Sequence, residues 1–204
     1  MTDARRFADA TQRNREPIAA VLLRVFPTNA RVLEVASGTG EHATYLADRL
    51  RVASWQPTDP NSDALRSIDA WRDALGASCV QPARSLDVHD KPWPDSLGAP
   101  FDAVVNINMI HIAPWSATAA LFEGAAKVLT NSGLVFLYGP FRRDGEHTAP
   151  SNRAFDESLR ARDATWGVRD LEAVVDVAAA NGFSLGEVVS VPANNLSVTF
   201  YHHR

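Results

Sequence analysis

Residues 32–42 read VLEVASGTGEH, and this stretch decides the fold. An apolar strand runs into a glycine-rich turn, and a helix starts at Glu41. Gly38 and Gly40 let the backbone bend sharply and approach a ligand closely, and the helix start offers unpaired N–H groups. The same letters also satisfy the dinucleotide pattern G-x-G-x-x-G/A, and a purely structural turn is a further alternative.

Outward from this turn, helical and strand signals alternate, which is typical of an α/β fold with a mostly parallel sheet. The last two strands are joined by a connection too short for a parallel crossover, so they must pair antiparallel. The prediction is a seven-stranded, mostly parallel sheet with a terminal antiparallel hairpin and helices on both faces. Helices are expected over 3–25 (kinked or split at Pro17), 41–49, 62–75, 114–129, 152–160 and 168–181, and strands over 31–36, 53–57, 82–86, 101–106, 134–138, 184–191 and 197–202.

Composition narrows the class of protein. The chain has 204 residues, a net charge of -4 and a single cysteine, so an internal disulfide is impossible and no Cys–His metal framework is present. The charge balance offers no basic footprint for nucleic acid and no polybasic signal for a membrane. With neither a secretory signal nor an apolar run of about 18 residues, we expect one cytoplasmic domain over residues 1–204, without a metal. The oligomeric state stays open.

Acidic residues near the strand ends indicate which ligand the turn binds. Asp59 ends the second strand, where a carboxylate can accept hydrogen bonds from both ribose hydroxyls of a nucleoside. The alternative is a plain turn residue before Pro60. Glu34 in the first strand and Asp87 after the third suit S-adenosylmethionine (SAM), which is cationic at sulfur and at its amino group, whereas a pyrophosphate is poorly served by extra acids.

The ordered motifs resemble those of class I SAM-dependent methyltransferases, over nearly the whole chain. This resemblance implies a Rossmann-like fold and SAM as cofactor, with S-adenosylhomocysteine (SAH) as product. It implies that Gly38 and Gly40 line the methionine part and that Asp59 takes the ribose. Ala36 stands where these enzymes usually have their first glycine. The other cofactor-binding residues that the resemblance implies are Asn14, Glu34, Leu86, Asp87, Val88 and Asn106.

More narrowly, five strings resemble the methyltransferase-like 26 family. They are NREPI (14–18), WQPTDP (55–60), NMIHIAPW (108–115), YGPFRRDGEHT (138–148) and PANNL (192–196). These strings are long and specific, and they imply SAM binding without implying a methyl acceptor.

Three residues beyond strands four and five are candidates for catalysis. Methyl transfer chiefly needs the acceptor atom held in line, and a general base is needed only if the acceptor must lose a proton. His111 could be that base or a substrate contact, or a residue at a helix start. His147 could act from the polar loop or lie solvated there, and Tyr138 could point into the site or pack in the core.

Two segments are expected to enclose the acceptor. Residues 139–167 form a loop-rich insertion on the substrate side, and residues 1–29 form an N-terminal helical lid. The substrate candidates are Asn108, Trp115, Arg142 and Asn194, although Trp115 could be a packing residue and Asn194 part of a hairpin turn. The sequence therefore predicts a methyltransferase for a small molecule. A non-catalytic SAM-binding protein and an NAD(P)-dependent oxidoreductase remain alternatives.

Overall fold

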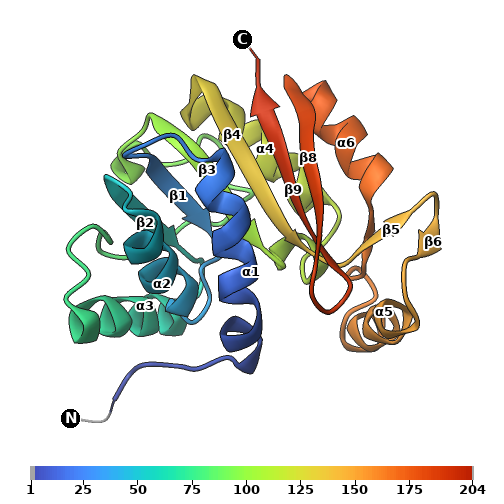
Figure 1. Cartoon of the computed structure of the whole chain (residues 1–204), viewed down its shortest axis with the longest axis horizontal. Helices are drawn as coiled ribbons and strands as arrows, with labels where there is room; N and C mark the ends of the chain where they lie inside the picture. Colours follow the sequence, from blue (N-terminus) through green and yellow to red (C-terminus); the bar gives the residue numbers. More distant parts are fainter. Residues whose placement is uncertain (1–2, 204) are drawn as a thin grey trace.

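The computed structural model describes residues 3–203 and has one central sheet flanked by helices (Figure 1). Residues 1–2 and 204, which the single-domain and lid predictions include, lie outside the described residues. The sheet order is β2-β1-β3-β4-β9-β8. Its strands are β1 (Arg31–Val35), β2 (Ser54–Thr58), β3 (Phe101–Ile107), β4 (Leu129–Gly139), β8 (Phe183–Val191) and β9 (Asn195–His202).

The pairing directions make this a mixed sheet. β2, β1, β3 and β4 run parallel to one another. β9 is antiparallel to both β4 and β8. The terminal antiparallel hairpin is therefore confirmed. The carboxyl ends of β1, β2 and β3 meet at one edge, which is where an open α/β sheet binds its ligand.

The prediction of a seventh strand over 82–86 is wrong, because the sheet has six strands. Next to β2 there are only isolated bridges, from Trp55 to Val80 and from Thr58 to Arg84. Pro57 has no N–H to donate to this segment, and the N–H of Ala83 bonds to the Asp69 side chain at 2.9 Å. The ladder hydrogen bonds therefore break off in the middle of the segment.

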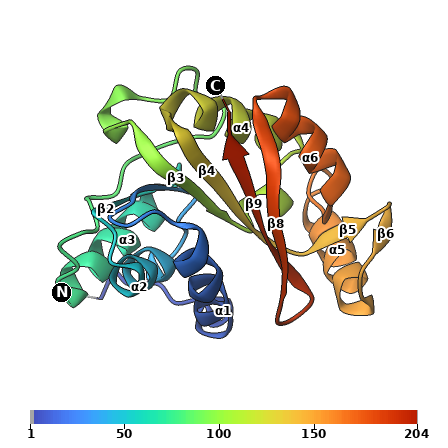
Figure 2. The ribbon, with the colours of Figure 1, turned by 45° about the horizontal axis from the view of Figure 1, so that its top comes forward.

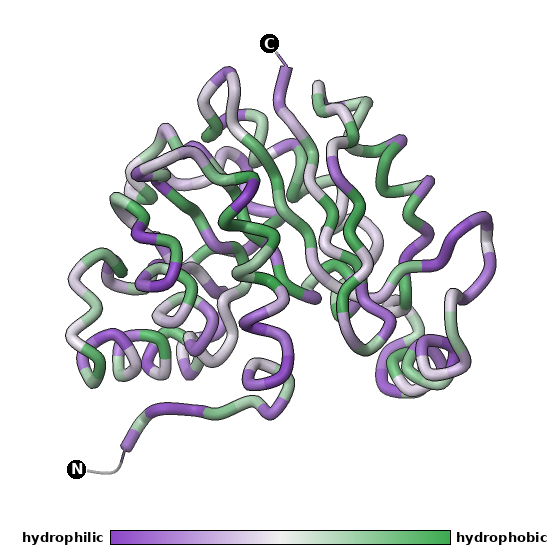
Figure 3. Tube along the Cα trace, viewed as in Figure 1, coloured by the Kyte–Doolittle hydropathy of each residue, from purple (hydrophilic) through white to green (hydrophobic). Residues whose placement is uncertain are grey.

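Helices cover both faces of the sheet. α1 (Asp9–Val25) and α2 (Glu41–Leu50) pack on one face, with α3 (Ser62–Leu75) beside α2, and α4 (Ser116–Val128) and α6 (Leu171–Ala180) cover the other (Figure 2). β4 shows the alternation directly, since Phe136 faces α1 and Val135 faces the opposite cluster. The apolar residues accordingly lie along the central strands and the inner helix faces (Figure 3).

Two segments differ from the expected elements. The first helix begins at Asp9 rather than Asp3, and it runs through Pro17 without splitting. The insertion, expected to be irregular apart from one helix, contains β5 (Phe141–Arg143), β6 (Glu146–His147) and α5 (Pro150–Arg162). Its two strands form a small sheet ordered β6-β5-β7 with β7 (Arg169–Asp170), which occupies the expected start of the helix over 168–181. Strands of two or three residues are too short to show a period of two in sequence.

Two short 3-10 turns complete the structure, η1 (Asp95–Leu97) and η2 (Met109–His111). Within residues 3–203, no helix is long and apolar enough to cross a lipid bilayer. The same residues contain no group of three or more His, Cys, Asp or Glu side chains placed to hold a metal ion.

Candidate functional site

The glycine-rich turn has a strongly curved backbone. Ala36, Gly38 and Gly40 have φ angles of 58°, 59° and 89°, all in the left-handed region that glycine adopts most easily. A Cβ at Gly40 would lie 2.6 Å from the Cα of Ile68, whereas a Cβ at Gly38 would meet no atom within 4 Å. Gly40 is thus required for packing, and Gly38 borders open space that a ligand can enter.

Asp59 is joined directly to this turn. Its Oδ2 accepts a hydrogen bond of 3.0 Å from the N–H of Gly38, and its Oδ1 accepts one of 2.9 Å from the N–H of Asn61. The residue is 8% exposed. A carboxylate can accept about four hydrogen bonds, so both oxygens keep capacity for further donors. The arrangement suits a pair of ribose hydroxyls.

Asn106 supplies a second polar group between β1 and β3. Its Nδ2 donates to the carbonyl of Val35 at 2.9 Å, while its Oδ1 is buried and has no hydrogen-bond partner among the described residues. A buried amide oxygen without a partner is uncommon and calls for a donor. An adenosyl cofactor carries such donors in its amino, hydroxyl and adenine groups, so these residues fit it.

Glu34 lies deeper in the sheet than these groups. It is buried, and its Oε2 accepts a hydrogen bond of 3.0 Å from the indole Nε1 of Trp55. Burial raises the pKa of Glu34 to about 7, against the opposing effect of bonds from Trp55 and Ser37. Direct contact between Glu34 and a cofactor stays a prediction.

The predicted adenine-side segment divides between core and surface. Leu86 and Val88 belong to the apolar cluster that includes α4 and α6. Asp87 is exposed, and its Oδ1 accepts a hydrogen bond of 2.9 Å from the N–H of His89. Hydrogen bonding by that N–H, and by the His89 ring, lowers the pKa of Asp87 despite some burial. The predicted adenine contact is not tested by these placements.

A cavity of about 340 Å³ lies beyond the ends of β3 and β4, where Asn108 and Tyr138 line it. It is bounded by α1, by α5 and by the turn between β8 and β9, which Figure 1 and Figure 2 both show at the same end of the sheet. Asn14 links the cavity to the turn, because its Oδ1 bonds His42 Nε2 at 2.8 Å, two residues after Gly40. The lining residues are Ala10, Arg13, Asn14, Pro17, Asn108, Tyr138, Pro140, Ser151, Asn152, Phe155, Pro192, Ala193 and Asn195.

Three of the predicted site residues therefore come together in one cavity. They are Asn14, Asn108 and Tyr138. The Tyr138 hydroxyl accepts a hydrogen bond of 3.0 Å from Asn195 Nδ2, and the Asn14 side chain lines the same cavity. Burial raises the pKa of Tyr138, so the phenol stays protonated near neutral pH.

The two predicted catalytic histidines lie behind this cavity. His111 is fully buried, packs edge-on against Phe141 and has its pKa lowered to about 3 by burial and by the charge of Arg169. His147 directs Nε2 toward the carboxylate of Asp156 at 3.6 Å. Neither histidine is among the described residues that line the cavity. A catalytic role for either stays a prediction.

The remaining substrate candidates lie around the cavity rather than in its wall. Trp115 stacks under the guanidinium of Arg169 at 5.7 Å, and Arg142 pairs with His147 in the β5–β6 ladder. Asn194 is exposed and donates to the Ser151 hydroxyl at 3.0 Å. Its neighbour Asn195 lines the cavity instead.

Most of the lining residues were not candidates from sequence, among them Arg13 and Phe155. The signal for Arg13 is a helical spacing, because Ala10, Arg13, Asn14 and Pro17 share one face of α1. Phe155 lies on α5 one turn after Asn152, and it is one of the few large apolar side chains left exposed.

Comparison with known proteins supports the same fold. Over 95% of its length the chain is similar to an O-methyltransferase family protein from Burkholderia thailandensis, with a TM-score of 0.76 and 15% identity, covering 56% of that chain. It is also similar to the magnesium protoporphyrin IX methyltransferase of Synechocystis determined with bound SAH, with a TM-score of 0.70 and 13% identity, covering 94% of this chain and 83% of that one. At these identities the likeness shows the α/β methyltransferase fold.

The chain is also similar in sequence to a curated relative. The fatty-acid O-methyltransferase of Mycolicibacterium smegmatis is 38% identical over 108 residues, which are 53% of this chain. The match spans 36% of that relative's length, so about a third of it is covered.

Residues 5–202 match a single protein family, which is almost the whole described chain. The match includes the glycine-rich turn, Asp59 and every residue that lines the cavity. The chain therefore belongs to the family described as "Protein of unknown function (DUF938)".

Proposed function

We propose that the chain is a SAM-dependent methyltransferase that acts on a small molecule in the cavity between α1 and α5. One observation carries the proposal, the hydrogen bond from the N–H of Gly38 to Asp59. It fixes a buried carboxylate beside an open glycine turn at the carboxyl ends of β1 and β2. The fold likeness to methyltransferases and the curated relative support the same class.

Different residues of the chain would bind different parts of the cofactor. Asp59 would hold the ribose hydroxyls with the capacity its two backbone bonds leave free. The turn at Gly38 would accommodate the methionine part, and Asn106 Oδ1 would accept a hydrogen bond that it otherwise lacks. When bound, the cofactor supplies an electrophilic methyl group on a sulfonium. A cation of this kind is favoured by the nearby acids Glu34 and Asp59.

The acceptor would approach the cofactor from the cavity that Asn108 lines. This residue follows β3, adopts a left-handed backbone with φ of 65° and lines the cavity. Enclosure by α1, α5 and the β8–β9 turn would hold the acceptor in position, which can supply much of the rate of a displacement reaction. Of the three catalytic candidates, Tyr138 is the one among the described residues that lines the cavity, so we assign it the contact with substrate.

Ligand-dependent thermal unfolding tests the cofactor. A ligand present at 100 times its dissociation constant stabilises the folded state by about 2.7 kcal/mol, which raises Tm by several degrees for a chain of this size. We expect this shift with SAM and with SAH, and no shift with NADH. Asp59→Ala should abolish it, while Asp63→Ala, an exposed residue at the start of α3, should keep it.

The outcomes separate the alternatives. A shift with NADH alone would identify an oxidoreductase and refute the proposal. A shift with SAM that persists in Asp59→Ala would refute the assigned cofactor site. Binding of SAM without SAH release across broad panels of small-molecule acceptors would favour a non-catalytic SAM-binding protein.

A further inference from the structure

The described side chains that line the cavity include a positive charge and no negative charge. Its polar lining consists of Arg13, Tyr138, Ser151 and the four asparagines at 14, 108, 152 and 195. No Asp, Glu or His is among the lining residues of the part of the chain that the structure describes. The acids of the site, Glu34 and Asp59, lie on the cofactor side instead. The acceptor side therefore offers one cation, many amide groups and no carboxylate.

Hydrogen-bond donors converge on one corner of this cavity. Asn195 Nδ2 donates to the Tyr138 hydroxyl at 3.0 Å, and Asn14 lines the same cavity. Arg13 lines this cavity as well. A phenol oxygen that accepts from an amide keeps its own O–H free to donate. The corner therefore presents an O–H and a guanidinium, a pair suited to an anionic oxygen.

His42 orients this corner from behind. It is the second residue of α2 and is partly buried, and desolvation together with the charge of Arg15 lowers its pKa to about 4. It is thus neutral at physiological pH, and Nε2 can donate to Asn14 Oδ1 across 2.8 Å. With its Oδ1 occupied by His42, Asn14 keeps its amide nitrogen as a donor. Neither His42 nor Tyr138 therefore changes its protonation state near neutral pH.

The lining also supplies no general base. Arg13 is always protonated, and the pKa of Tyr138 is raised above its usual value by burial. A neutral alcohol cannot lose its proton here, and an ammonium group would face Arg13 with no lone pair to attack. An acceptor that is already ionised needs neither step.

We infer that the methyl acceptor is a carboxylate on an apolar body, held through one oxygen by Arg13 and Tyr138. This inference rests on the proposed function. The second carboxylate oxygen is then free to form the bond to the methyl carbon. The carbon–sulfur bond breaks, its electron pair goes to sulfur, and SAH and a methyl ester result without proton transfer. Apolar lining at Pro17, Pro140 and Phe155 matches the apolar body.

Matched acceptors test the inference. Three sets that share their bodies, arylalkyl and medium-chain carboxylic acids with the corresponding primary alcohols and primary amines, are assayed for SAH release and for binding to the SAH-loaded protein. We expect the acids alone to bind and to be methylated. At saturating SAM, so that titration of Glu34 does not limit cofactor binding, their rate should stay flat from pH 6 to 8, because no catalytic base titrates. Preferred methylation of alcohols or amines, or acids that neither bind nor react, would overturn the inference.

Substitutions in α1 provide a second test of the inference. Arg13→Gln should raise KM for the acid roughly tenfold or more, since a hydrogen-bonded charge is lost, and Arg13→Lys should keep part of the affinity. Arg24→Gln is the matched control, because Arg24 lies at the far end of α1 and pairs with Glu187. Acid binding unaffected by Arg13→Gln would refute the inference. The Tm shift with SAH, measured in each variant, shows separately whether the proposed cofactor binding itself holds.

Discussion

The indole Nε1 of Trp55 donates a hydrogen bond of 3.0 Å to the carboxylate of Glu34, which joins β2 to β1 inside the core. Trp55 is fully buried and Glu34 nearly so. A single neutral donor compensates a buried carboxylate poorly, and burial accordingly raises the pKa of Glu34 to about 7. Glu34 is therefore close to half-protonated at neutral pH when the cofactor is absent.

This pKa makes the stability depend on pH in a definite direction. In the unfolded chain Glu34 ionises near its ordinary value of 4.5, whereas in the folded protein it stays protonated up to about 7. Its contribution to the free energy of unfolding is therefore full below pH 4.5 and is lost as the pH rises through 7, by roughly 3 kcal/mol in total.

Glu34→Gln should remove this pH dependence. We expect the variant to gain stability relative to wild type at pH 8 compared with pH 5, measured by urea unfolding at both values. Glu187→Gln, which changes an exposed carboxylate on β8, should leave the difference between the two pH values intact. An unchanged pH dependence in Glu34→Gln would show that Glu34 is ionised in the folded protein.

Two glycines of the turn should respond differently to alanine. Gly38→Ala places a Cβ in open space, so its cost is the left-handed backbone alone, about 1–2 kcal/mol. The variant should fold but lose most of its Tm shift with SAH, because the methyl group intrudes on the ligand side. If Gly38→Ala folds and keeps the full shift, the turn does not bind the cofactor.

Gly40→Ala should instead act on the fold. Its Cβ would lie 2.6 Å from the backbone Cα of Ile68 in α3, and φ is 89°. Overpacking against a backbone atom together with the strained φ should cost roughly 2–5 kcal/mol. Urea unfolding of both variants compares the two losses directly, and a smaller loss at Gly40 than at Gly38 would contradict this assignment.

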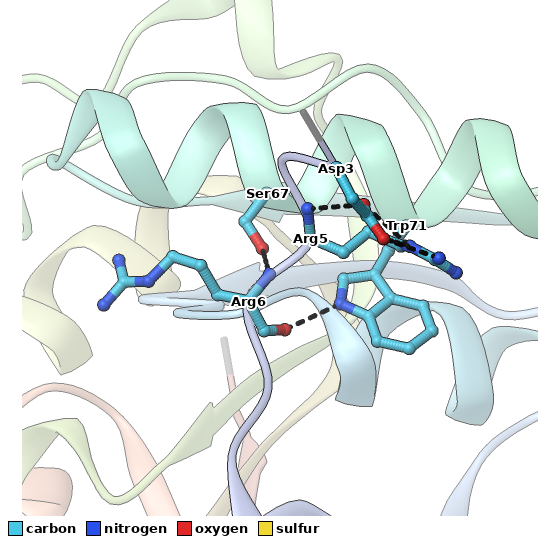
Figure 4. Close-up of polar contacts among 5 residues, drawn as sticks. All are labelled: Asp3, Arg5, Arg6, Ser67 and Trp71. Atoms are coloured by element: carbon cyan, nitrogen blue, oxygen red, sulfur yellow. Dashed lines mark hydrogen bonds and ion pairs between the residues drawn. The ribbon is translucent and has the colours of Figure 1, made fainter. Parts of the chain in front are cut away.

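The N-terminal segment before α1 is tied to the turn through α3. Figure 4 shows the N–H of Arg6 donating to the Ser67 hydroxyl at 2.8 Å and the Trp71 indole donating to the Arg6 carbonyl at 2.9 Å. The Ser67 hydroxyl in turn donates to the carbonyl of Thr39, within the turn, at 2.7 Å. Ser67 therefore connects the segment over 3–8 to Thr39, the residue between the two glycines.

Ser67→Ala should loosen this connection. Two partly buried polar groups, the Arg6 N–H and the Thr39 carbonyl, would lose a partner, at a cost of about 1–3 kcal/mol in stability. Hydrogen exchange of the amides over 4–8 should become faster, and the exchange protection that SAH confers there should shrink. Ser62→Ala, on the exposed start of α3, is the control. Unchanged exchange over 4–8 would argue against the predicted lid.

The periodic spacing of apolar residues predicted the elements that pack in the core. It failed where the hydrogen-bond partners of a segment are distant in sequence. The 3.6-residue spacing of Ile18 and Leu22 predicted α1, but its first turns did not form because side chains of α2 and α3 bind the backbone of 3–8. Glu41, for example, accepts the N–H of Ala8 at 2.7 Å. No local pattern reports such a contact.

The candidate site shows the same division. The turn and Asp59 are close in sequence to strands with clear apolar patterns, so their meeting at one sheet edge could be predicted. The acceptor cavity joins α1 to α5 and to the β8–β9 turn, and α1 is more than a hundred residues from both. Arg13 and Asn195 meet at Tyr138 only through tertiary packing, and a single sequence carries no signal for that.

The carboxylate of Asp156 anchors α5. Asp156 accepts hydrogen bonds from the N–H of Val168 at 2.7 Å and from Arg160 Nε at 3.0 Å, and His147 Nε2 lies 3.6 Å away. Asn152, one turn earlier, lines the cavity. Asp156 thus holds the helix that forms one wall of the acceptor site, and His147 belongs to this anchor.

Asp156→Asn and His147→Gln separate anchoring from catalysis. Asp156→Asn loses the charge paired with Arg160 and should lower stability by about 1–3 kcal/mol and raise KM for the acceptor, whereas Asp176→Asn on the exposed face of α6 should do neither. If His147 only supports α5, His147→Gln should keep kcat within about tenfold of wild type. Loss of a general base lowers kcat by roughly 10²–10⁴. A drop of that size in a variant that still folds and binds SAH would establish His147 as the catalytic base, and would also contradict an acceptor that arrives ionised.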